Sequence, residues 1–357
     1  IIYNKMFTQR TDINEKTVTQ YFNAVEENVK IHGEKTFVFM LVGSFYESYV
    51  KYDKVNDIHF GSPLWELKDI LRAEPGEKKF KLDNPNHIIK MWGVQDHYID
   101  TREQYLLENG YKVAYYRQEK DSKGNVIGRY LSHISTPGTT IPKDGKLLDI
   151  ASNNTSCMIF KLHGKGEKKI SYGYSNYDVL TGHTTIFEGE TENTRIDHTT
   201  FNELENYVIN NTPRELLVVT NVDDKLYDKI KKSVGLMEFD INKFDFNDIK
   251  SKNCFKQEYI EKTIKTVYKN SEYFSEFEFY ELSTSSLCFL IDYINIYNPL
   301  ALEKITSPNI IENDKLLLAN HTLHQLNIIS ANNNTKGKKL SSVLSSLNNC
   351  ITTLGKR

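Results

Sequence analysis

Residues 39–49 read FMLVGSFYESY, and this stretch is the most informative in the chain. An apolar run ends at Gly43-Ser44, and an aromatic residue, one spacer and a carboxylate follow as Phe45, Tyr46 and Glu47. Alternate side chains of an extended segment share a face. We therefore expect Phe45 and Glu47 to place a flat apolar ring beside a hydrogen-bond acceptor. The same residues also allow a core Phe45 and a solvated Glu47 at a strand end.

The surrounding residues, up to about 140, have the pattern of a mixed α/β domain. Residues 13–31 have helical apolar spacing, with Asp12 as the N-cap and Gly33 at the end. Strands are predicted at 37–42, 111–116 and 129–136, and a helix at 99–108. Residues 72–87 are polar and contain Pro, Gly and Asn, which predicts a loop. This loop is basic, so it is either solvated or in contact with phosphates; its cations are Arg72, Lys78, Lys79 and Lys81.

The next segment, residues 147–250, predicts a second α/β domain. Three strand-like runs at 156–162, 169–180 and 183–188 have hairpin-length gaps. A helix at 201–211, a strand at 215–220 and a helix at 222–234 follow. This element order is typical of a ribonuclease H-like domain. From residue 254 the pattern is helical, Pro299 ends a helix, and the chain stops in mid-pattern, as expected of a truncated domain.

Composition sets broad limits on function. The chain has 357 residues, of which 39% are hydrophobic and 26% charged, and its net charge is −2. That balance argues against a general polyanion binder but allows one DNA-binding face. There is no apolar run long enough to span a membrane and no signal-peptide core. The four cysteines have no C-x-x-C spacing, so we expect buried thiols in a reducing compartment; they are Cys157, Cys254, Cys288 and Cys350.

Eight stretches in colinear order resemble motifs of the MutS family of DNA mismatch-recognition proteins. Residues 43–47 resemble its G-x-F-Y-E motif, 110–118 its G-Y-K-V-A-I-C-E-Q and 134–139 its I-V-T-P-G-T. Residues 93–97 resemble its A-G-V-P-Y-H-A element, with Gln95 and Asp96 replacing Pro and Tyr. Residues 174–182, 212–219 and 340–357 also resemble family motifs. So do residues 318–329, where Ala319 and Asn327 replace two acids.

The resemblance implies a fold and a mechanism. It implies a multidomain α/β chain: a mixed-sheet mismatch-binding domain at 1–140, a ribonuclease H-like connector domain at 147–250, and the truncated start of a helical core and lever domain at 254–357. In this family the Phe of G-x-F-Y-E inserts between base steps and the Glu reads the disturbed base. Carried to this chain, these roles fall to Phe45 and Glu47. We expect Lys51, Lys54, Arg72, Lys78, Lys79 and Lys81 to contact or steer the phosphates.

The resemblance also implies partners and cofactors. Duplex DNA with a mismatch is the expected ligand, and a dimer and a downstream mismatch-repair protein are expected of the full-length form. The localisation would be intracellular and DNA-associated. We expect no enzyme activity and no cofactor in this chain, because it has no G-x-x-x-x-G-K-[ST] phosphate loop. ATP and Mg²⁺ are expected only with an ATPase domain outside it.

Other readings remain open. The chain could be a structural or regulatory module that keeps the MutS domains and acts through protein contacts. Asp149 and Asp178 lie in the ribonuclease H-like segment and would be the carboxylates of a magnesium nuclease. His321 and His324 have a spacing that suits a metal, but no third ligand is evident, which favours a surface or capping role. Ser135-Thr136 has no His–Asp partner pattern for a hydrolase triad.

Overall fold

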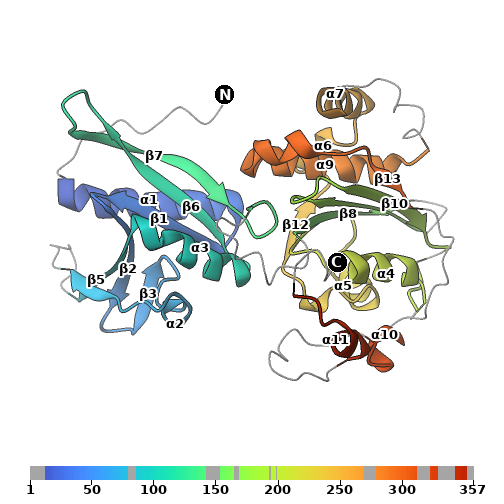
Figure 1. Cartoon of the computed structure of the whole chain (residues 1–357), viewed down its shortest axis with the longest axis horizontal. Coiled ribbons are helices and arrows are strands. Elements are labelled where there is room, and N and C mark those ends of the chain that lie inside the picture. The colour runs from blue at the N-terminus through green and yellow to red at the C-terminus, as the bar shows by residue number, and fades with distance from the viewer. Residues whose placement is uncertain are drawn as a thin grey trace. The chain divides into compact units, whose positions relative to one another are not determined.

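The computed structural model describes nine stretches of the chain. They are residues 13–78, 86–141, 153–164, 169–192, 194–197, 199–268, 279–311, 322–328 and 342–351. They form two compact units that divide between Pro137 and Gly138, and each unit has its own sheet (Figure 1). No helix in these stretches is long and apolar enough to cross a membrane.

The first unit has a mixed sheet. Its strands are β1 (Thr36–Val42), β2 (Phe45–Asp53), β3 (Ile58–Gly61), β4 (Gly76–Lys78), β5 (His87–Gln95), β6 (Lys112–Lys120) and β7 (Val126–Ser135). The order is β4-β5-β2-β1-β6-β7, with β3 also paired to β2. Strands β1 and β6 are parallel, and the other pairs are antiparallel. A mixed α/β unit is therefore confirmed here.

Helices cover both faces of this sheet (Figure 1). Helix α1 (Ile13–His32) lies on one face, where Tyr21 packs against Tyr49 with ring centroids 5.1 Å apart. Helices α2 (Lys68–Leu71) and α3 (Ile99–Glu108) cover the opposite face. There Phe39, Tyr46 and Trp92 form one apolar core with residues of both helices. A short 3-10 helix, η1 (Asp96–Tyr98), connects β5 to α3.

One local prediction was wrong in the first unit. Residues 76–78, predicted as part of a loop, form the edge strand β4 and pair with β5. The reason is tertiary, because the Lys78 side chain contacts residues of β2 and β5. Predicted N-cap Asp12 lies outside the described residues, as do Lys79 and Lys81.

The second unit has three antiparallel strands, two parallel strands that follow them, and a short edge strand that pairs in parallel with the third. Its strands are β8 (Asn154–Leu162), β9 (Ile170–Asp178), β10 (Thr184–Glu190), β11 (Glu215–Thr220), β12 (Ile241–Asp245) and β13 (Asn309–Ile310). The order is β12-β11-β8-β9-β10-β13. The pairs β8–β9 and β9–β10 are antiparallel, and β11 is parallel to both β8 and β12. The predicted run of three hairpin strands followed by helix–strand alternation is therefore present.

Helices also cover both faces of the second sheet. Side chains of β8 and β11 alternate between two cores, so that Met158 and Phe160 face one layer and Cys157 and Ile159 the other. The first layer contains α4 (Asn202–Asn211) and α5 (Asp224–Ser233), and the second contains α7 (Gln257–Tyr268) and α9 (Glu281–Tyr297). Shorter helices are η3 (Leu236–Glu238), α6 (Ile249–Asn253), η4 (Pro299–Lys304), α10 (Thr322–Gln325) and α11 (Val343–Leu347).

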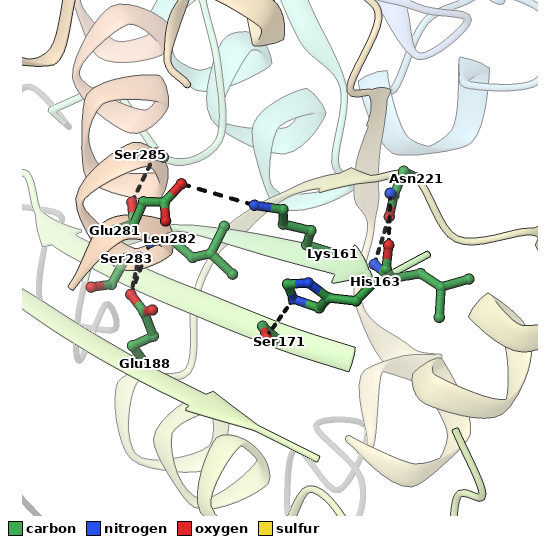
Figure 2. A network of polar contacts seen from close by, with 10 residues as sticks. Lys161, His163, Ser171, Glu188, Asn221, Glu281, Leu282, Ser283 and Ser285 are labelled. Carbon is green, nitrogen blue, oxygen red and sulfur yellow. Dashed lines mark hydrogen bonds and ion pairs between the residues drawn. The ribbon is translucent and has the colours of Figure 1, made fainter. Parts of the chain in front are cut away.

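Helix α9 is bound to the second sheet by polar contacts at its first turn. The carboxylate of Glu188, on β10, accepts hydrogen bonds from the backbone N–H groups of Leu282 and Ser283, both at 2.9 Å (Figure 2). The Lys161 ammonium lies 3.9 Å from the Glu281 carboxylate in the same view. Because α9 supplies one layer of this unit, the expected boundary near residue 250 falls inside a compact body.

Candidate nucleic-acid interface

Phe45 lies at the hairpin between β1 and β2. The two-residue turn Gly43-Ser44 joins the strands, and Gly43 has a φ of +66°, in the left-handed region that glycine adopts readily. Phe45 is the first residue of β2 and pairs with Val42 on one side and Gln95 on the other. Its side chain is 40% exposed. An aromatic ring this exposed at a strand end contributes little to a core, so the core alternative for Phe45 is not supported.

Glu47 lies two residues along β2, on the face that Phe45 shares. Its side chain is 13% exposed and forms an ion pair with Lys78 at 3.2 Å. It also accepts a hydrogen bond from the Tyr49 hydroxyl. Gly93 is its partner on β5, and a Cβ there would lie 3.6 Å from Glu47 Cγ and 4.0 Å from Phe45 Cβ. The alternative of a solvated Glu47 at a strand end is therefore wrong, because two side chains and a neighbouring strand enclose it.

Buried and partly buried polar side chains lie near this carboxylate. Burial raises the pKa of Tyr49 well above its usual value, and the contact with Glu47 raises it further. Burial lowers the pKa of Arg129, which interacts electrostatically with both Tyr49 and Glu47. The Arg129 guanidinium donates to Gln20 Oε1 at 2.8 Å. The carboxylate therefore has two cationic neighbours, Lys78 and Arg129, in a partly desolvated site.

The predicted basic residues that the structure describes do not gather around Phe45. Lys78 is bound to Glu47, so its ammonium is engaged within the protein. Lys51 lies six residues beyond Phe45 on β2, about 20 Å away along the strand, and Lys54 follows the end of that strand. Arg72 is exposed and follows α2, which packs on the face opposite Glu47. Of the described cations on this list, the structure brings only Lys78 to Glu47.

Sequence reasoning missed several residues at this end of the sheet. Because β1 and β6 are parallel, the end of β6 and the start of β7 extend in the direction of Phe45. Val126, Ile127 and Tyr130 on β7 are 40%, 47% and 48% exposed. Tyr49 was also missed, although the alternation that pairs Phe45 with Glu47 places it on the same face. The sequence predicts a strand at 129–136 but not its place at this end of the sheet, because that place depends on pairing between distant strands.

The alternative sites lack support in the described residues. Asp178 accepts hydrogen bonds from Leu180 N and Thr181 Oγ1, which is a turn-forming role. Asp149 and His321 lie outside the described stretches, as does the side chain of His324. Within the described residues, no group of three or more His, Cys, Asp or Glu could hold a metal ion.

The cysteine prediction holds for three of the four residues. Cys157, Cys254 and Cys288 are buried free thiols, whereas Cys350 is exposed, so the prediction of burial was wrong there. Cys350 follows α11 in a stretch where most side chains are exposed, and no core covers it.

Comparison with known proteins finds one matching domain family and several relatives. The family model described as MutS domain I matches residues 18–144, which include β1, β2 and the Phe45–Glu47 pair. A MutS homolog of Acanthamoeba polyphaga mimivirus is 27% identical over 99% of this chain and 33% of its own length. The DNA mismatch repair protein MutS of Listeria monocytogenes serotype 4b is 28% identical over 61% of this chain and 23% of its own length. That of Methanosarcina acetivorans is 30% identical over 48% of this chain. The chain thus spans about a third or less of these relatives, and its residues 18–144 belong to the MutS domain I family.

Proposed function

We propose that this chain recognises mismatched or looped duplex DNA in DNA mismatch repair. One observation carries the proposal: an exposed Phe45 shares a strand face with an enclosed Glu47, inside the segment that matches MutS domain I. Phe45 would enter the minor groove and partly unstack a base step, and Glu47 would accept a hydrogen bond from the displaced base.

The energetic basis is the deformability of DNA. Unstacking costs about a few kcal/mol per step and costs less at a mismatch, where stacking and pairing are already weak. A difference of about 1.4 kcal/mol between matched and mismatched steps gives tenfold selectivity. Glu47 adds to this difference, because a carboxylate that finds no donor in a well-paired duplex is unfavourable near phosphates.

The remaining domains are part of the same proposal. The strand order β12-β11-β8-β9-β10 supports a ribonuclease H-like connector domain, and the packing of α9 on this sheet supports a connector domain that would continue beyond residue 250. The helical residues that follow would begin a core and lever domain. The full-length protein would form a dimer and would bind a downstream repair protein. Because the sequence has no phosphate loop, we propose that these residues do not hydrolyse ATP.

The test is binding of a matched and a G·T-containing duplex to the wild type and Phe45→Ala at one fixed salt concentration. We expect Phe45→Ala to bring the ratio of the two affinities close to one and to leave the melting temperature nearly unchanged. Phe60→Ala is the matched control, because Phe60 is a 46% exposed aromatic on β3, beside Lys51 at the other end of β2. It should keep the wild-type ratio.

Two results would contradict the proposal. One is an unchanged affinity ratio in Phe45→Ala. The other is a destabilisation of about 3–5 kcal/mol, the cost of truncating a core Phe, which would return Phe45 to a structural role.

A further inference from the structure

The two contacts of Glu47 both fall on one of its oxygens. Lys78 Nζ lies 3.2 Å from Oε2, and the Tyr49 hydroxyl donates to the same Oε2. Among the described residues, no hydrogen bond or ion pair reaches Oε1. A carboxylate has lone pairs on both oxygens, so the contacts of the described residues leave Oε1 able to accept a hydrogen bond.

The two residues that hold Oε2 are themselves held in place. Tyr49 is 1% exposed, and its ring packs against Tyr21 of α1. Lys78 reaches the site from the edge strand β4, with its ammonium 3.3 Å from Met91 Sδ and 5.3 Å from the centre of the Tyr49 ring. The contacts of Lys78 therefore come from β2 and β5, the two strands that also carry Glu47 and Gly93.

We propose that Tyr49 and Lys78 are positioning residues for mismatch recognition, which fix Glu47 through Oε2 and leave Oε1 to accept the base. This inference rests on the proposed function of Phe45 and Glu47. It assigns Lys78 a role in specificity and not a phosphate contact. A side chain fixed in advance loses less conformational entropy on binding, so the hydrogen bond from the base contributes more to affinity.

The test compares Tyr49→Phe and Lys78→Met with the wild type on matched and G·T duplexes at fixed salt. Each change keeps most of the side-chain volume and removes one contact to Oε2. We expect the ratio of mismatched to matched affinity to fall roughly three- to tenfold in each variant. Lys78→Arg, which keeps a cationic donor, should restore most of the ratio.

Two controls match these changes. Tyr21→Phe removes a buried hydroxyl that donates to Val38 O at 3.1 Å and not to Glu47. Lys90→Met removes a lysine of the same unit whose ammonium lies over the Tyr52 and Trp65 rings. Both should keep the wild-type ratio, and melting curves of all variants will show whether the fold is intact.

A Glu47→Ala background separates positioning from phosphate binding. There Tyr49→Phe and Lys78→Met should not change the affinity ratio further, because their effect acts through Glu47. If Lys78→Met instead weakens binding to both duplexes equally and leaves the affinity ratio at its wild-type value, Lys78 is a phosphate contact and the inference fails. The inference also fails if Tyr49→Phe and Lys78→Met lower the affinity ratio by the same factor in the Glu47→Ala background as in the wild type. The proposed function can fail separately, through an unchanged ratio in Phe45→Ala.

Discussion

Gly43 is the residue that turns β1 into β2 and so fixes the position of Phe45. Its φ of +66° lies in the left-handed region, and a Cβ there would meet no other atom within 4 Å. The cost of a substitution is therefore conformational and not steric. We predict that Gly43→Ala destabilises the protein by about 1 kcal/mol, measured by denaturant unfolding. Gly93→Ala is the control, because Gly93 has no positive φ and its Cβ would make ordinary contacts; an equal loss there would contradict this account.

At the same scale, the sequence predicted the placement of Phe45 and Glu47 better than it predicted the residues around them. The two-residue alternation in an extended segment was enough to place Phe45 and Glu47 on one face, and it holds in β2. The partner of Glu47 could not be predicted, because Lys78 lies 31 residues away in a stretch whose composition indicates a loop. Only the pairing of β4 with β5 brings its ammonium to the carboxylate.

At the scale of elements, the close contact between α9 and β9 decides how the second unit is built. Gly173 on β9 lies beneath the start of the helix, and a Cβ there would be 2.3 Å from the backbone carbon of Leu282. The helix would have to shift and would strain its hydrogen bonds to Glu188 (Figure 2). We predict that Gly173→Ala costs about 1–3 kcal/mol of unfolding free energy, the usual cost of overpacking. Gly164→Ala, with open space around it, should cost nothing measurable; equal losses in the two variants would exclude this explanation.

The same contact separates the features of the second unit that local sequence predicts from the one that it does not predict. Hairpin strands β8, β9 and β10 and the strand β11 follow from local apolar runs and turn residues, so the sequence predicts them within a few residues. The apolar helix at 281–297 is also predicted as a helix. Its place is not, because helical spacing shows that a face is buried and does not show which sheet covers it.

At the scale of the whole molecule, the two units have separate cores and should respond separately to core mutations. Both tryptophans, Trp65 and Trp92, belong to the first unit, so tryptophan fluorescence reports the unfolding of that unit alone. Phe39 is fully buried in the first unit, with its ring centroid 6.3 Å from that of Trp92, and Phe160 is fully buried in the second. Truncating either ring to Ala should cost about 3–5 kcal/mol in its own unit.

We therefore predict that Phe39→Ala lowers the unfolding midpoint followed by tryptophan fluorescence, and that Phe160→Ala leaves this midpoint unchanged. Far-UV circular dichroism sees both units, so Phe160→Ala should lower part of the dichroism transition without a matching change in fluorescence. Separate units need not unfold in one step, and a difference between two probes is the sign of this behaviour. If Phe160→Ala shifts the fluorescence midpoint as far as Phe39→Ala does, the two units unfold together. Their stabilities would then be coupled despite their separate cores.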